Sequence, residues 1–259
     1  MNFLLFIIPI ILATTLSCSS DNEQQQLSEM KMTDDMPSIL VFSKTAGFRH
    51  ESIEAGNAAL KKIGEDHNLQ FTFTENSDLL ASESIFDFDA VVFLNTTGTL
   101  FDEKDRVFLQ RFIQSGGGFV GIHSAADTEY DWPWYEGLVG AYFKNHPNNP
   151  NVRRAIVKVL NEEHPAVQDI PGEWERRDEW YNYRSFQDGL NILMKMDTES
   201  YEGSEHPGNH PIAWYREYDG GRTFYTGMGH TSDSFSEPLF LKHLTGGIFY
   251  AIDKELTNP

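Results

Sequence analysis

Three histidines in loop-like segments are the side chains best suited to chemistry in this sequence. His50 lies shortly after Gly47, His123 follows the apolar run 119–122, and His230 follows Gly229. An imidazole titrates near neutral pH and also binds metal ions, so each could transfer a proton or help to hold a divalent cation. The alternative for each is a structural histidine whose ring is hydrogen-bonded to the backbone.

His123 stands at a position where α/β proteins often place a reactive residue. Three glycines precede a short apolar segment that reads as a buried strand, and the small residues 124–126 follow the histidine. A strand that ends in a tight turn before a helix raises one side chain at the carboxyl edge of the sheet. We therefore expect His123 to be partly exposed there, with space around it for a ligand.

A pair of adjacent carboxylates, Asp178 and Glu179, precedes Trp180 and Tyr181. Carboxylates can act as general bases, accept hydrogen bonds from sugar hydroxyls or bind metals. Neighbours on a strand point to opposite faces, so only one of the two would reach a given pocket. The alternative is a solvated acidic loop. The candidate catalytic residues are His123, Glu179, Asp178 and His230, and the candidate metal ligands are His50, His123 and His230.

Aromatic residues gather in the second half of the chain, which contains all five tryptophans. Aromatic walls with polar partners are typical of sugar-binding pockets, although core packing explains such residues equally well. The candidate substrate-binding residues are His50, Arg49, Asp127, Trp132, Tyr181, His210 and Trp214. His210 leads into a predicted strand, whereas His146, His164 and His206 each precede a proline and are interpreted as turn residues.

The elements that would position these residues alternate in the first half of the chain. Predicted strands at 38–43, 71–73, 90–94 and 119–122 are separated by predicted helices at 51–67 and 102–114. This alternation is typical of a parallel sheet with helices on both faces. Loops at the carboxyl ends of parallel strands share one edge, so the three histidines could meet there.

The second half of the chain predicts a different arrangement. Strands are expected at 155–159 and 191–196, a hairpin at 212–226 around Asp219-Gly220-Gly221, and a closing helix at 238–252. The predicted fold class is therefore α/β, with a parallel sheet, helices on both faces and an antiparallel C-terminal extension. We expect one domain over 38–253, followed by a tail at 254–259.

Composition excludes several classes of function. The 259 residues carry a formal charge of −19, which disfavours nucleic acid and anionic lipid surfaces as partners. Cys18 is the only cysteine, so intrachain disulfides and a cysteine nucleophile in the folded domain are excluded. No phosphate-binding glycine motif is present, and we predict no bound nucleotide. No cofactor is certain, and a divalent metal ion is the one candidate.

The N-terminus predicts export and anchoring. Residues 1–17 contain an uncharged apolar run of signal-peptide length, and residues 18–37 form a polar tether that begins at Cys18. We expect lipidation of Cys18 and a location in the cell envelope, with the membrane contacted only through the lipid. A plain cleaved signal peptide is the alternative.

Five segments in chain order, at 43–50, 121–127, 178–181, 210–214 and 227–231, together resemble the trehalose-utilisation (ThuA-like) family. The resemblance implies a flavodoxin-like sheet similar to that of class I glutamine amidotransferases, and a sugar ligand. His123 stands where those amidotransferases carry their cysteine, so glutaminase chemistry is not implied. Asn209 stands where the family pattern has an acidic residue, which argues against a charged or metal-binding role at that position.

These observations support an enzyme that acts on a sugar or keto-sugar by acid–base chemistry. His123 or Glu179 would be the general base, while His50 and His230 polarise a carbonyl or hold a metal. Isomerisation, elimination and hydrolysis all remain open. The alternatives are a non-catalytic carbohydrate-binding surface lipoprotein and a protein with a role in assembly. Histidines that converge on one pocket would favour the enzyme.

Overall fold

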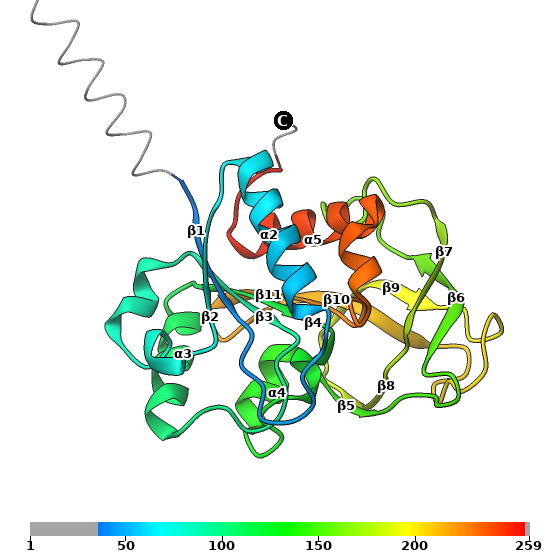
Figure 1. Ribbon diagram of the computed structural model, residues 1–259, viewed down its shortest axis with the longest axis horizontal. Helices are drawn as coiled ribbons and strands as arrows, with labels where there is room; N and C mark the ends of the chain where they lie inside the picture. The colour runs from blue at the N-terminus through cyan, green and yellow to red at the C-terminus, as the bar shows by residue number, and fades with distance from the viewer. Residues whose placement is uncertain (1–35, 257–259) are drawn as a thin grey trace, which may run out of the picture. The chain divides into compact units, whose positions relative to one another are not determined.

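The computed structural model describes residues 36–256, and the chain from Pro37 onward forms one compact unit. Its centre is a nine-stranded sheet with the order β2-β1-β3-β4-β11-β10-β9-β6-β7 (Figure 1). Cys18 and the predicted signal peptide lie outside the described residues. Within residues 36–256, no helix is long and apolar enough to cross a membrane.

The first five strands in this order are parallel. They are β2 (Gln70–Thr74), β1 (Ser38–Phe42), β3 (Ala90–Leu94), β4 (Gly118–Ile122) and β11 (Gly221–Thr226). The inner strands are apolar and buried on both faces, as expected for a parallel sheet covered by helices. Ile122 is level with Leu94 on one side and Thr226 on the other, so these three strands end at the same edge.

The remaining strands are antiparallel. They are β10 (His210–Tyr218), β9 (Asn191–Met196), β6 (Val152–Val159) and β7 (Glu173–Glu179). Strand β11 joins the two halves, because it pairs in parallel with β4 and antiparallel with β10. In Figure 1 the strands β6 and β7 stand steeply against β9 and β10, as expected for the cumulative twist of a large sheet.

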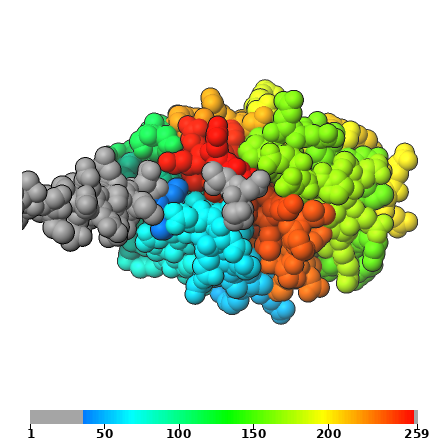
Figure 2. Space-filling view, turned by 90° about the horizontal axis from the view of Figure 1, so that it is seen from above, coloured from blue at the N-terminus to red at the C-terminus, as the bar shows by residue number. Residues whose placement is uncertain are grey.

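Helices cover both faces of the parallel half, as Figure 1 shows. They are α2 (Ile53–His67) and α5 (Pro238–Ala251) on one face, and α3 (Glu103–Gln114) and α4 (Pro133–Val139) on the other. Figure 2 shows the surfaces around α2 and α5, in cyan and orange to red, lying side by side. Asp102 begins α3 by accepting hydrogen bonds from the backbone N–H groups of Lys104 and Asp105.

Small elements complete the fold. A second sheet pairs β5 (Ala141–Asn145) with β8 (Asn182–Phe186). The described part of the chain also has four short 3₁₀ helices: η1 (Ser77–Leu79), η2 (Glu83–Asp87), η3 (His123–Asp127) and η4 (Ser232–Ser236). The predicted fold class is confirmed, with a parallel core, helices on both faces and an antiparallel extension. Strands β5, β7 and β8 and helix α4 are additions that the sequence patterns did not predict as elements.

Candidate functional site

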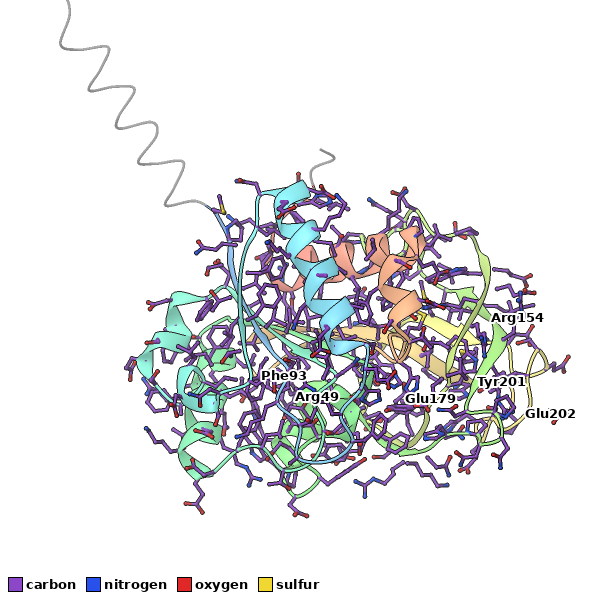
Figure 3. The ribbon with its side chains drawn as sticks, in the orientation of Figure 1. Arg49, Phe93, Arg154, Glu179, Tyr201 and Glu202 are labelled. Atoms are coloured by element: carbon purple, nitrogen blue, oxygen red, sulfur yellow. The ribbon has the colours of Figure 1, made fainter. Side chains whose placement is uncertain are left out.

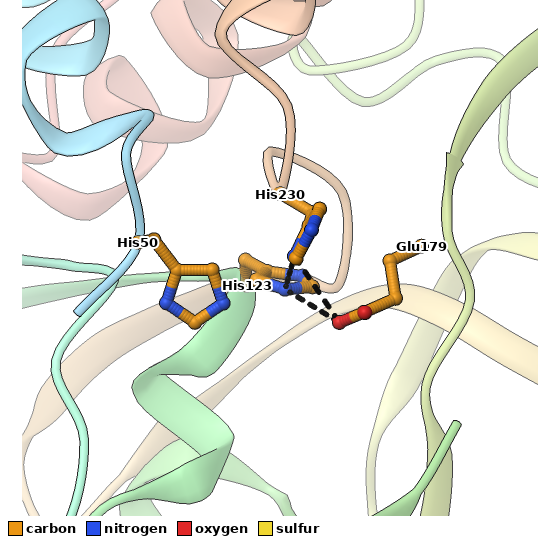
Figure 4. A group of neighbouring side chains, drawn as sticks. All are labelled: His50, His123, Glu179 and His230. Carbon is orange, nitrogen blue, oxygen red and sulfur yellow. Dashed lines mark hydrogen bonds and ion pairs between the residues drawn. The ribbon is translucent and has the colours of Figure 1, made fainter. Parts of the chain in front are cut away.

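Four side chains from separate parts of the chain meet at the carboxyl edge of the sheet (Figure 4). His50 comes from the loop between β1 and α2, and His123 is the first residue after β4. Glu179 ends β7, and His230 lies in the loop after β11. One nitrogen or oxygen atom from each lies within 4.8 Å of the others. The structure thus brings the three sequence-predicted histidines together and adds one of the two predicted carboxylates.

Three of these side chains lie especially close together. Nε2 of His123 is 3.4 Å from Oε2 of Glu179, and Nδ1 of His230 is 3.2 Å from the same oxygen. The two histidine nitrogens are 3.3 Å apart. The three atoms therefore form a nearly equilateral triangle, and the ring of His50 packs edge-on against both other histidine rings.

The backbone at His123 adopts a strained conformation. Its φ is 47°, in the left-handed region that a non-glycine residue enters only at a cost of about 1–3 kcal/mol. The conformation is held from two sides: the His123 carbonyl accepts a hydrogen bond from the Tyr225 hydroxyl at 2.7 Å, and His123 Nδ1 donates one to the Gly227 carbonyl at 2.9 Å. Strain of this kind is concentrated at functional sites.

His123 is fully buried, so the expectation that it would be partly exposed is wrong. The ring of Tyr181 lies against its imidazole, with the ring centres 4.1 Å apart. Tyr181 is held in turn by His210, whose Nε2 lies 2.7 Å from the Tyr181 carbonyl oxygen. Two predicted substrate-binding residues thus lie beside and behind the imidazole of His123.

The adjacent carboxylates Asp178 and Glu179 contact different parts of the protein. Both are buried at the end of β7, so the solvated acidic loop considered as an alternative is wrong. Glu179 faces the histidines, and its Oε1 accepts a hydrogen bond from Asn151 Nδ2 at 2.8 Å. Figure 3 shows Glu179 well inside the molecule, while Arg154 and Glu202 lie at its edge.

Asp178 turns toward the loop that carries His230. Its oxygens accept hydrogen bonds from the backbone N–H of Gly229 at 2.8 Å and of His230 at 3.1 Å. The hydroxyl of Ser234 and the guanidinium of Arg176 contact the same carboxylate, each at 3.1 Å. Gly229 has a φ of 111°, which favours glycine and lets both N–H groups turn to one carboxylate. Asp178 therefore positions His230.

The surroundings shift the pKa values of three cluster residues. Burial, together with the nearby His123 and His230, lowers the pKa of His50 to about 2. Burial would raise the pKa of Glu179, but its close contacts with His123 and His230 outweigh burial and hold that pKa below its usual range. Burial would lower the pKa of His230, yet its contact with Glu179 raises it overall. Shifts of this kind are characteristic of functional sites.

A cavity of about 480 Å³ borders the cluster. It is lined by residues 48–52, Val152 and residues 230–232, so His50 and His230 form part of its wall. Phe48, one of the lining residues, has 64% of its surface exposed. A larger cavity of about 650 Å³ lies at the opposite edge of the sheet, around Gly117 and Arg222, and includes no residue of the cluster.

The other predicted site residues lie in varied places. Arg49 lines the cavity and pairs with Glu54 and Glu75 at 2.9 Å each. Asp127 accepts a hydrogen bond from Tyr130, and burial raises its pKa. The cavity lining includes no tryptophan.

Trp132 and Trp214 are buried in the core. Trp132 stacks on Trp134, and Trp214 stacks on Tyr225. The indole nitrogen of Trp214 donates a hydrogen bond to the Val139 carbonyl at 2.9 Å.

Two residues beside Glu179 were not among the sequence-predicted candidates. His146 Nε2 is 3.5 Å from Glu179 Oε1, and Asn151 donates to the same oxygen. His146 precedes Pro147, a pattern that indicates a turn and gives no sign of a contact with Glu179. Asn151 follows a proline in an asparagine-rich segment, and no sequence feature distinguishes it from a loop residue.

Comparison with known proteins identifies the family. The family model described as ThuA, trehalose utilisation, matches residues 38–251. The chain belongs to the ThuA family. The resemblance seen in the sequence is thereby confirmed, and this ThuA protein has a carbohydrate-related role. No curated protein matches the chain.

Solved structures support the same fold for this ThuA protein. A ThuA-like protein from Bacteroides uniformis superposes with a TM-score of 0.71 at 20% identity, covering 85% of this chain and 94% of that one. A ThuA-like protein from Parabacteroides merdae gives 0.69 at 18% identity, covering 87% and 93%. A β-galactosidase from Bacillus circulans gives 0.53 at 11% identity, covering 88% of this chain and 33% of that one. At these identities the likeness shows the fold alone.

Proposed function

We propose that the protein is an enzyme that transfers a proton to or from a sugar or keto-sugar at the cluster of His50, His123, Glu179 and His230. The observation that carries this proposal is the convergence of three imidazoles and one carboxylate beside a cavity of about 480 Å³. A protein that only binds sugar needs hydroxyl partners and aromatic walls. It has no need for a strained histidine in contact with a buried carboxylate.

The geometry supports specific roles within the cluster. With no metal ion bound, Glu179 is the general base, because Asn151 orients one of its oxygens and leaves the other facing the histidines. His50 and His230 line the cavity, where their rings can polarise a carbonyl or hydroxyl oxygen of the ligand. Asp178 acts by positioning, since its oxygens are occupied by the loop of His230.

The number of carboxylates favours one type of reaction. Glycoside hydrolysis commonly uses two carboxyl groups on opposite sides of the scissile bond. Within the described residues, the cluster contains one carboxylate, and the neighbouring Asp178 faces away from it. Removal of a proton beside a ketone needs one base and a group that polarises the carbonyl. Isomerisation or elimination of a keto-sugar therefore fits this site better than hydrolysis does.

The test is turnover of a panel of disaccharides and their keto derivatives. We expect Glu179→Gln to lower the rate by about two to four powers of ten, the usual contribution of a general base. Glu175→Gln is the matched control, because Glu175 lies on the same strand but is exposed and pairs with Arg154. Normal turnover by the Glu179 variant would refute the assignment. Sugar binding without turnover of any panel member would support the binding lipoprotein instead.

A further inference from the structure

We infer that His50, His123, Glu179 and His230 together bind one divalent transition-metal ion. The spacing of the donor atoms is the first reason. Zinc–nitrogen and zinc–oxygen bonds of roughly 2.0–2.1 Å in a tetrahedral site place neighbouring ligand atoms about 3.3 Å apart. The three closest donor atoms of His123, Glu179 and His230 are separated by 3.2, 3.3 and 3.4 Å. These three atoms therefore have the spacing of one triangular face of a tetrahedral zinc site.

The second reason is the tautomer of His123. Its Nδ1 faces the carbonyl oxygen of Gly227 at 2.9 Å, and a carbonyl can only accept, so Nδ1 carries the proton. When that is its only proton, the ring presents a lone pair at Nε2, and this is the form that binds a metal ion. That lone pair faces a carboxylate oxygen of Glu179 at 3.4 Å, so two acceptors point at each other. A cation between them binds both of these atoms, and it can also bind the ligand atoms of His50 and His230.

The third reason is that the side chains of His50, His123 and Glu179 each have a partner outside the cluster. Histidines that bind metals usually donate their second ring nitrogen to a carbonyl or other oxygen, and carboxylate ligands are themselves hydrogen-bonded. Gly227 plays this part for His123, and Asn151 plays it for Glu179.

The two histidines on the cavity wall are held differently, His50 through its ring and His230 through its backbone. Ser124 Oγ lies 3.3 Å from His50 Nδ1, and the carboxylate of Asp178 holds the backbone of His230. Figure 4 shows His50 on the side opposite Glu179, with its ring turned toward the other histidines.

The donor set favours some ions over others. Three imidazole nitrogens and one carboxylate oxygen suit zinc and the neighbouring divalent ions of the first transition row. Magnesium and calcium prefer oxygen ligands, so they should bind here far more weakly. Because His50 and His230 also line the cavity, a bound ion would be accessible to a sugar oxygen. Such an ion supplies Lewis acidity toward that oxygen.

The experiment measures binding directly and needs no substrate. The purified full chain is stripped with a chelator, checked by circular dichroism, and titrated with Zn²⁺, Mn²⁺, Co²⁺ and Mg²⁺ in separate calorimetric runs. We expect one equivalent of a transition-metal ion per chain and at least 100-fold weaker binding of Mg²⁺. Co²⁺ absorption in the visible region should report a low-symmetry site with nitrogen ligands.

Variants locate the site. Glu179→Gln and His230→Ala should each weaken binding at least about tenfold, the lower end of the loss that is typical even for the outer partners of a metal ligand. His67→Gln is the control, because His67 lies at the end of α2, outside the cluster. Absence of stoichiometric binding by the folded stripped protein would overturn the inference. Unchanged affinity in both folded cluster variants would do so as well.

The results separate this inference from the proposed function. Full turnover of a sugar by the metal-free protein, with no ion bound on titration, would refute the metal site and support the acid–base enzyme. Stoichiometric metal binding that depends on Glu179 and His230, without turnover of any sugar, would support the metal site and refute the proposed enzyme activity.

Discussion

Replacement of Asp178 by asparagine tests how the His230 loop is held. The aspartate carboxylate accepts hydrogen bonds from Gly229, His230 and Ser234, and it also forms an ion pair with Arg176. An asparagine has nearly the same shape, but one of its two oxygens is replaced by an NH₂ group that can only donate. Whichever way the amide turns, NH₂ meets groups that also donate.

The expected cost follows from these contacts. A hydrogen bond to a charged group contributes about 1.5–3 kcal/mol, and removal of one partner of a buried ion pair costs about 3–5 kcal/mol. Arg176 keeps a second carboxylate, because Glu237 lies 3.2 Å away. We therefore expect Asp178→Asn to lower the free energy of unfolding by about 3–5 kcal/mol. That is a large share of the roughly 5–15 kcal/mol typical of a folded domain.

Denaturant unfolding followed by circular dichroism measures this loss, with Glu175→Gln on the same strand as the exposed control. A double-mutant cycle with Arg176→Met tests the ion pair. The double variant should lose less stability than the two single changes added together, because each single change leaves a partner without its counterpart. A loss below about 1 kcal/mol for Asp178→Asn would refute the view that this buried carboxylate organises the loop.

Two further predictions concern pH and membrane attachment. Burial lowers the pKa of His164 and of His210 to about 4 and that of His243 to about 3. Between pH 6.5 and 5 the unfolded chain thus binds more protons at these residues, and stability should fall by about 2 kcal/mol per histidine as the pH drops. Unfolding curves at pH 7, 6 and 5 check this, and His243→Gln should reduce the slope, whereas a pH-independent midpoint would contradict it. We also propose that Cys18 carries a lipid: labelled fatty acid should be incorporated into the wild-type protein in cells and lost with Cys18→Ala, and incorporation by the variant would refute it.

The parallel half of the fold and the position of the histidines could be predicted from sequence. Short apolar strands between amphipathic helices indicate a parallel sheet, and the loops that carry His123 and His230 follow strands that end at one edge. The loop that carries His50 likewise follows β1. For each histidine, the strand pattern and the loop that follows the strand were enough to predict its position at this edge.

The role of the acidic pair could not be predicted in the same way. In the order of the sheet, β7 is the outermost strand of the antiparallel half, far from β4. The end of β7 nevertheless contacts the loop after β11 through Asp178, and no local sequence pattern records such a contact. The choice between Asp178 and Glu179 depends on that geometry. The burial of His123 is likewise set by Tyr181, which lies 58 positions later in the chain.

The position of β11 has a consequence for synthesis of the chain. This strand is made after the other eight strands of the sheet, yet it lies between β4 and β10 in the finished structure. Until residues 221–226 leave the ribosome, β4 and β10 each have an unpaired side, and such edges invite pairing with other chains. Neither half-sheet can pair its open edge by itself. His230 follows β11 in the chain, so it too reaches its place in the site only after β11 has been made. A chain that stops before β11 would therefore be an aggregation-prone pair of half-sheets rather than a smaller version of the protein.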